Sequence, residues 1–221
     1  MGSVYQSVVF CGLLVCSCLL VSVRTSHLVD LTLGFTELPL NTSHFKLQTP
    51  YDLPASSRYS FNHGIHRLWV YSTDKPFSKK SRGSRSEIRI QGYDYSSGVW
   101  QFEGHGYIPS GTSGVSVMQV FGADPPRATT LMVRTYNGSL TYYRSPLLVP
   151  YIWDRWFQLN VIHDVEASIV RVYIDRVLVY EAPGQGGASH YFKFGVYKQN
   201  DPSYYMESRW KGIRVLHKVH Y

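Results

Sequence analysis

The chain has very little cysteine, and all of it lies in one short stretch near the start. Cys11, Cys16 and Cys18 are its three cysteines in 221 residues. If that stretch is removed as a leader, the remaining protein has no thiol, which excludes disulfides, cysteine metal sites and cysteine nucleophiles. The roughly 195 residues that remain can bury enough surface to fold without such cross-links.

Other absences exclude whole classes of chemistry. There is no Gly-x-Ser-x-Gly turn, no phosphate-binding loop and no run of Lys and Arg, so the motifs of serine hydrolases, nucleotide-binding proteins and nucleic-acid-binding proteins are missing. The histidines lack carboxylate or cysteine partners at the spacing of a metal site. We therefore expect no metal, no cofactor and no nucleic-acid partner. The histidines considered are His63, His66, His163, His217 and His220.

The longest apolar run is 16 residues, from Val8 to Val23, and it carries no charge. This is short for a membrane span and typical of the core of a signal peptide. We expect a signal peptide over residues 1–25, with cleavage between Ser22 and Ser26, and one domain over residues 26–221. An uncleaved anchor is the alternative, since no Lys or Arg precedes the run.

The chain is basic, with a formal charge of +7 that falls to +6 when Arg24 leaves with the leader. Aromatic residues make up 15% of it. A basic, aromatic-rich protein of the secretory pathway favours an acidic partner, either an anionic polysaccharide or a small carboxylate. No later stretch is apolar for long enough to span a membrane, so we expect no stable membrane insertion of the mature chain.

Helical periodicity is also missing, and short runs of Val, Ile, Tyr, Phe and Trp recur between Gly, Pro, Asn and Ser clusters, as in an all-β protein. Residues Pro50–Ser57 could hold one turn of helix. We expect a two-sheet, concave jelly-roll sandwich. The predicted strands are Phe45–Leu47, Leu68–Tyr71, Ser86–Ile90, Val99–Tyr107, Val115–Phe121, Thr129–Tyr136, Leu140–Arg144, Trp156–His163, Val170–Ile174, Val177–Glu181, Tyr191–Tyr197 and Met206–Leu216.

Two Asn-x-Ser/Thr sequences, at Asn41 and Asn137, are candidate glycosylation sites in a secreted chain. Asn137 is followed by Gly138, and this pair between two predicted strands also indicates a two-residue hairpin turn.

The stretch from Tyr191 to Gln199 has two different faces. Because side chains alternate along a strand, Phe192, Phe194 and Val196 form an apolar face. The opposite face has tyrosine, lysine and glutamine around Gly195. It is either a tyrosine-rich exposed surface or a binding surface. The residues of that face are Tyr191, Lys193, Gly195, Tyr197 and Gln199.

A second strand has the same design. Arg85, Glu87, Arg89 and Gln91 share one face of the predicted strand. One interpretation is a surface ladder of ion pairs, which contributes little stability. The other is a carboxylate-binding clamp in which Glu87 holds both guanidinium groups in place.

Two further predicted strands also pair an apolar face with a polar one. Gln119 and Phe121 share a face of one strand. The other strand places Gln101, Glu103, His105 and Tyr107 together. We expect the polar faces of these strands to line a groove.

These stretches resemble the signature blocks of the alginate-lyase-type polysaccharide lyases, which are concave jelly rolls. The blocks are Arg85-Ser86-Glu87-Ile88-Arg89, Gln119-Val120-Phe121 and Tyr191 to Gln199. The resemblance implies that Arg85 and Gln119 neutralise a substrate carboxylate, that Tyr197 transfers protons, and that Lys193 and Gln199 contact the ligand. Phe121 stands where these lyases commonly have a histidine, and phenylalanine can neither act as a base nor neutralise charge.

The stretches Leu68–Pro76, Gly92–Gly104 and Gly187–Lys193 are similar to the plant citrate-binding proteins of the same superfamily. This resemblance implies a vacuolar or secreted protein that binds citrate or a related carboxylate through Arg85, Arg89, Gln119, Lys193, Tyr197 and Gln199. One alternative is a lyase that cleaves a uronate-containing polysaccharide by β-elimination. Another is a lectin-like protein that binds cell-wall glycans without turnover.

Overall fold

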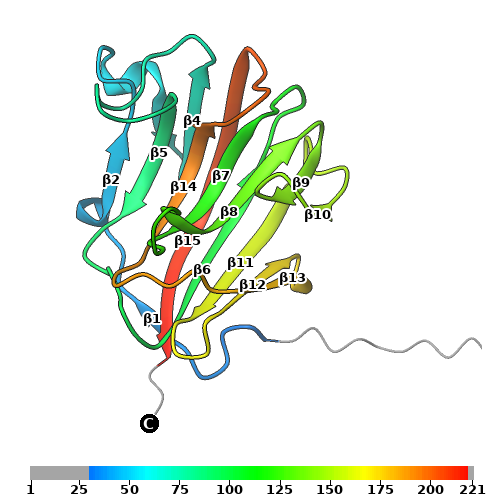
Figure 1. Cartoon of the computed structure of the whole chain (residues 1–221). Coiled ribbons are helices and arrows are strands. Elements are labelled where there is room, and N and C mark those ends of the chain that lie inside the picture. The colour runs from blue at the N-terminus through cyan, green and yellow to red at the C-terminus, as the bar shows by residue number, and fades with distance from the viewer. Residues whose placement is uncertain (1–29, 219–221) are drawn as a thin grey trace, which may run out of the picture.

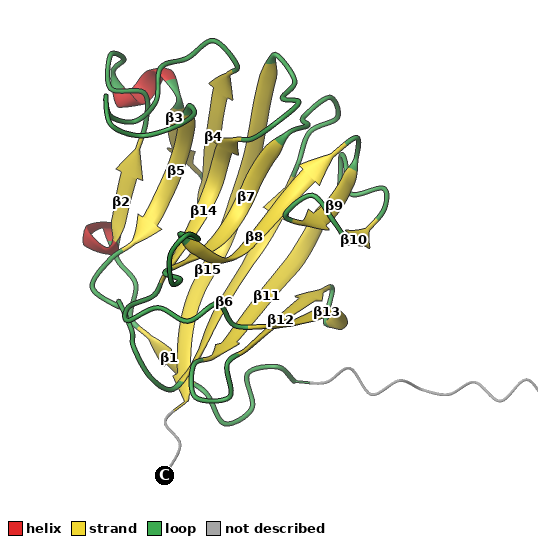
Figure 2. Cartoon of the chain, in the orientation of Figure 1, coloured by secondary structure: helices red, strands yellow, loops and turns green. Residues whose placement is uncertain are grey.

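The computed structural model describes residues 30–218, so the predicted signal peptide lies outside the described residues. Two antiparallel sheets pack face to face (Figure 1). The jelly-roll sandwich predicted from the sequence is therefore confirmed. Two short 3-10 helices, η1 (Thr42–His44) and η2 (Ala55–Ser57), are the helices of the described part, and both lie at the β2 side of the molecule (Figure 2).

The front sheet in Figure 1 has seven strands in the order β10-β9-β8-β7-β14-β5-β2. All of its pairs are antiparallel. The central position of β14, the strand on which the predicted site depends, is set by its pairing with β5 on one side and β7 on the other. The strands are β2 (Phe45–Gln48), β5 (Arg85–Ile90), β7 (Val115–Phe121), β8 (Thr129–Tyr136), β9 (Ser139–Tyr142), β10 (Leu147–Val149) and β14 (Tyr191–Lys198).

The second sheet has eight strands in the order β13-β12-β11-β6-β15-β4-β3, and β1 pairs with the far end of β15. Strand β15 is the longest of the described strands and lies in the interior of this sheet, between β6 and β4. The strands are β1 (Thr36–Leu38), β3 (Tyr59–Asn62), β4 (Ile65–Tyr71), β6 (Val99–Tyr107), β11 (Trp156–Asp164), β12 (Ile169–Ile174), β13 (Val177–Pro183) and β15 (Tyr205–Lys218).

The core lies between the two sheets and is built by the period-two apolar faces. Phe192, Phe194 and Val196 of β14 are fully or almost fully buried there, as their alternation predicts. Phe194 contacts Phe102 and Trp210 of the other sheet, with ring centroids 6.0 and 5.8 Å apart. The opposite side chains of β14 consequently point away from the core on the front of the molecule.

Each predicted strand corresponds to an observed one, whereas β1, β3 and β10 were not predicted. The turn of helix expected within Pro50–Ser57 is η2. The hairpin at Asn137-Gly138 is also confirmed, since both residues have positive φ, 48° and 80°, and Tyr136 pairs with Ser139 across the turn. No helix of residues 30–218 is long and apolar enough to cross a membrane.

Candidate functional site

The front face of the seven-stranded sheet collects most of the predicted site residues. The ladder places Lys193 of β14 between Arg89 of β5 and Gln119 of β7. Tyr197 of β14 is the ladder partner of Arg85. We call this surface the cationic face, defined by Arg85, Glu87, Arg89, Gln119, Phe121, Tyr191, Lys193 and Tyr197.

The floor of the cationic face is a buried cluster around one carboxylate. The Glu87 side chain is 1% exposed and forms an ion pair with the Lys193 ammonium, which is 3% exposed. Gln119 donates its side-chain amide to the other Glu87 oxygen. The Arg85 Nη1 lies 3.5 Å from the carboxylate. Glu87 therefore gathers three of the predicted site residues.

Burial lowers the pKa of Lys193, while the Glu87 carboxylate acts in the opposite direction. The neighbouring Arg85 and Arg89 charges lower it further. Loss of one partner of a buried, hydrogen-bonded ion pair strongly destabilises the folded protein, because the other charge is left buried without compensation. Lys193 and Gln119 are thus engaged with Glu87 at the base of the face, which leaves the two arginines as the more accessible cations.

Each of these arginines lies over the ring of a tyrosine. The Arg85 guanidinium carbon is 3.8 Å from the centroid of Tyr197, and that of Arg89 is 3.8 Å from the centroid of Tyr191. Such cation–π contacts fix the plane of the guanidinium group. In both arginines Nε is buried and has no hydrogen-bond partner among residues 30–218.

The predicted clamp, with Glu87 between two arginines, is only half present. Glu87 contacts Arg85, but the ion-pair partner of Arg89 is Asp94, which follows β5 in the loop. The reason is geometric. Lys193 and Gln119 approach Glu87 from the neighbouring strand and the next one, while Asp94 lies within reach of Arg89 from the same chain segment.

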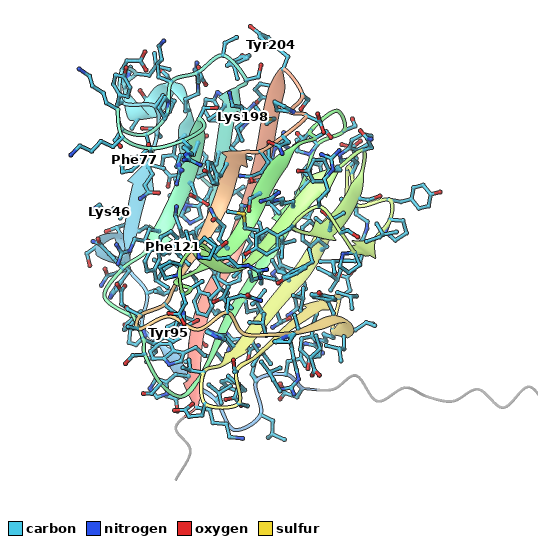
Figure 3. All side chains as sticks on the ribbon, viewed as in Figure 1. Lys46, Phe77, Tyr95, Phe121, Lys198 and Tyr204 are labelled. Carbon is cyan, nitrogen blue, oxygen red and sulfur yellow. The ribbon has the colours of Figure 1, made fainter. Side chains whose placement is uncertain are left out.

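Phe121 is the last residue of β7 and lies with its ladder partner Tyr191 at one end of the cationic face (Figure 3). Its ring stacks on Tyr191 with centroids 4.8 Å apart and an angle of 16° between the planes. Since Arg89 also lies against Tyr191, these three side chains form a continuous stack. At this position the sequence resemblance to lyases implies histidine, and the phenylalanine instead contributes an apolar wall.

Gln199 lies just beyond β14. Its side-chain amide donates to the backbone oxygens of Tyr197 and Lys198, at 3.2 and 3.1 Å. As a ligand contact it therefore remains a prediction, and a ligand would have to compete with these bonds.

The structure does not place β6 on this face. Gln101, Glu103, His105 and Tyr107 belong to the eight-stranded sheet, where β6 pairs with β11 and β15. The expectation that they extend the same groove is wrong, because alternation shows which face of a strand is polar but not which sheet the strand joins. His105 consequently cannot replace the missing histidine.

Two features near this face were not predicted. Phe77, from the loop between β4 and β5, lies 5.8 Å from the Arg85 guanidinium and marks the upper end of the face (Figure 3). On the β8 side, a hollow of about 350 Å³ is lined by Arg127, Thr129 and Tyr143, among others. Thr129 is the ladder partner of Phe121, so this hollow adjoins the face.

The described residues include no cluster of three His, Cys, Asp or Glu side chains that could hold a metal ion. The candidate glycosylation sites are both exposed. Asn41 caps η1 by accepting from the Ser43 backbone at 2.9 Å, and Asn137 lies at the hairpin tip. Glycan attachment at either site stays a prediction.

The sequence and the structure of the chain are similar to those of known proteins. The chain is 52% identical over 188 residues to a citrate-binding protein of Hevea brasiliensis, covering 84% of this chain and 79% of the relative. The alginate lyase AlgAT5 of polysaccharide lyase family 7 has a similar structure, with a TM-score of 0.65, 16% identity and coverage of 80% and 95%. An alginate lyase from Corynebacterium sp. superposes with a TM-score of 0.62 at 17% identity, covering 83% of this chain and 93% of the lyase.

At such low identity the structural matches show the fold alone. The homology to the citrate-binding protein and the family model are the stronger findings. The model for alginate lyases matches residues 38–217, which is nearly the whole described region. The chain therefore belongs to the alginate lyase family.

Proposed function

We propose that this protein binds citrate or a related small carboxylate on its cationic face. The observation that carries the proposal is the pair of arginines held over tyrosine rings on the outer face of the sheet, with side chains 11% and 27% exposed. Guanidinium groups held in a fixed plane match the two oxygens of a carboxylate. The relationship to a citrate-binding protein supports the choice of ligand.

In this proposal Arg85 and Arg89 contact ligand carboxylates directly. Lys193 adds positive charge from below, and the hydroxyl of Tyr197 and the amides of Gln119 and Gln199 complete the predicted set. The apolar stack of Phe121 on Tyr191 would exclude water beside the ligand and strengthen the charged hydrogen bonds. We place the mature protein in the vacuole or elsewhere in the secretory pathway, in keeping with the predicted leader.

The test is calorimetric titration of citrate into the wild type, Arg85→Ala and Arg85→Lys. A hydrogen bond to an ionised group contributes about 1.5–3 kcal/mol, so Arg85→Ala should weaken binding about 10- to 150-fold. Arg85→Lys keeps the charge but loses the planar fork, and should recover only part of this loss. Arg171→Ala is the matched control, because Arg171 forms an ion pair with Glu181 on the other sheet. Equal citrate affinity in Arg85→Ala and the wild type would contradict the proposal.

A second candidate function, β-elimination on a uronate polymer, is favoured by one contact. The Tyr197 ring lies against Arg85, so a proton-transferring hydroxyl and a carboxylate-binding cation are adjacent. Tyr197 would then act as both base and acid. An absorbance assay for unsaturated uronate products over a panel of polyuronates tests this function, and product formation that disappears in Tyr197→Phe would support it over simple binding.

A further inference from the structure

The outer face of the eight-stranded sheet carries a second organised set of aromatic and cationic side chains. Trp156, Tyr107, Arg209 and Arg67 are consecutive ladder partners across β11, β6, β15 and β4. Three strand spacings make this row roughly 14 Å long. Their neighbours along β4 and β15, which include Leu68, Met206 and Trp210, are buried in the core, so the row points away from the core. It therefore faces the opposite direction from the cationic face.

The two arginines of this row are held by a buried carboxylate. Glu207, which is 2% exposed, accepts from Arg67 Nε at 2.9 Å and from Arg209 Nε at 2.6 Å. Tyr205 donates its hydroxyl to the same carboxylate. Burial alone would raise the pKa of Glu207, but the bonds from Arg67, Tyr205 and Arg209 lower it overall. Glu207 thus stays ionised and positions both guanidinium groups.

The cations remain accessible on their outer sides. The Arg67 and Arg209 side chains are 45% and 39% exposed, and Lys211 is exposed. Within residues 30–218 the hydrogen bond of the Arg209 guanidinium is made by its Nε to Glu207, and the Lys211 ammonium has no ion-pair partner. One oxygen of the nearby Asp154 carboxylate, Oδ1, accepts from the Tyr107 hydroxyl and from the Ser110 backbone.

Each of these cations also borders an aromatic ring that is partly exposed. Arg67 lies 4.8 Å from the centroid of Trp69. Arg209 lies 5.1 Å from that of Tyr107, and Lys211 lies 4.4 Å from that of Trp156. An open hollow of about 620 Å³ runs over the β4 and β15 part of the row. Three cation–aromatic contacts are thus distributed over four neighbouring strands.

We propose that this row is a second binding surface, and that its ligand is an acidic polysaccharide. One side of a sugar ring consists largely of C–H groups, which pack on Trp and Tyr rings. The carboxylates of a uronate chain would bind the outer nitrogens of Arg209, Arg67 and Lys211. The open, unclosed shape of the hollow suits a polymer passing across it. Three cations are few for nucleic acid, whose affinity depends on many phosphate contacts.

The proposal does not rest on the proposed citrate site. Its test is affinity electrophoresis through gels that contain polygalacturonate or alginate, with the full-length mature protein. All variants carry Arg85→Ala, so that any polymer binding by the cationic face is reduced. The patch variants are Arg209→Gln with Lys211→Gln, and separately Trp69→Ala with Trp156→Ala. Arg171→Gln is the control, because Arg171 lies on the same sheet but is paired with Glu181.

We expect the dissociation constant for the uronate polymer to rise about tenfold or more in both patch variants and to stay unchanged in the control. Melting curves check that each variant is folded, and Arg67 and Tyr205 still hold Glu207 when Arg209 is replaced. Equal retardation of the patch variants and the Arg85→Ala parent would overturn the proposal. So would loss of binding on charge removal alone with no effect of the tryptophans, or tighter binding to single-stranded DNA or anionic vesicles than to the uronate polymers.

Discussion

The buried pair of Glu87 and Lys193 should be among the most sensitive contacts in the protein. Glu87→Gln keeps the size of the side chain but removes the charge that compensates a lysine only 3% exposed. In the wild type the Gln119 amide donates to the Glu87 carboxylate. In the variant an amide, which also carries a donor, replaces that carboxylate. Removing one partner of a buried ion pair costs about 3–5 kcal/mol, so Glu87→Gln should lower the free energy of unfolding by that amount.

Urea unfolding followed by tryptophan fluorescence measures this loss directly. The double variant Glu87→Leu with Lys193→Met is the control, since it removes both charges and leaves neither unpaired. The free energy of unfolding lost in this double variant should be well below the sum of the losses in Glu87→Leu alone and Lys193→Met alone. That difference identifies the cost as that of an uncompensated buried charge. A loss below about 1 kcal/mol in Glu87→Gln, as expected for a surface pair, would refute the assignment of Glu87 to the floor of the face.

Three other expectations follow from the structure. Phe121→His should raise formation of unsaturated uronate product if the family's chemistry is only weakened here, and should leave it at background if the protein is purely a binder. Stability should fall as pH drops from about 6.5 towards 4, because burial lowers the pKa of His66 to about 4 and that of His163 to about 3. The unfolded state then takes up more protons than the folded state, at about 1.4 kcal/mol per pH unit for each histidine. Melting temperatures of the wild type and His163→Gln across this range test it, and parallel curves would contradict it. Melting curves with and without reductant and chelator should coincide, and a drop of several degrees with either would disprove the expectation of a fold free of disulfides and metals.

Much of the fold could be predicted because strands of six or more residues repeat their apolar side chains with period two. β1, β3 and β10 have three or four residues each, which is short for that period to be recognised, although β2 and β9, which have four residues each, were predicted. The polar faces of β5, β7 and β14 were also identified correctly as a shared surface. Their sequence blocks lie together because the ladder brings Arg89, Lys193 and Gln119 into one row.

The partners within the site could not be predicted from the same pattern. Spacing along β5 places Glu87 equally far from Arg85 and Arg89, so only the neighbouring strands and loops decide between them. Lys193 comes from a strand more than 100 residues away, and Asp94 comes from a loop with no regular period. The sheet to which β6 belongs could not be predicted either, because polar and apolar side chains alternate along a strand in the same way in both sheets.

The order of the strands has a consequence for biosynthesis. β14 and β15 are the last two of the described strands, yet each lies in the interior of its sheet, between β5 and β7 and between β4 and β6. A nascent chain that ends before residue 191 therefore has a gap in both sheets and four unpaired edges facing those gaps. Such edges are open to pairing with other chains. Neither sheet can close until β14 and β15 have been synthesised, so the strands made before them need protection from such pairing until then.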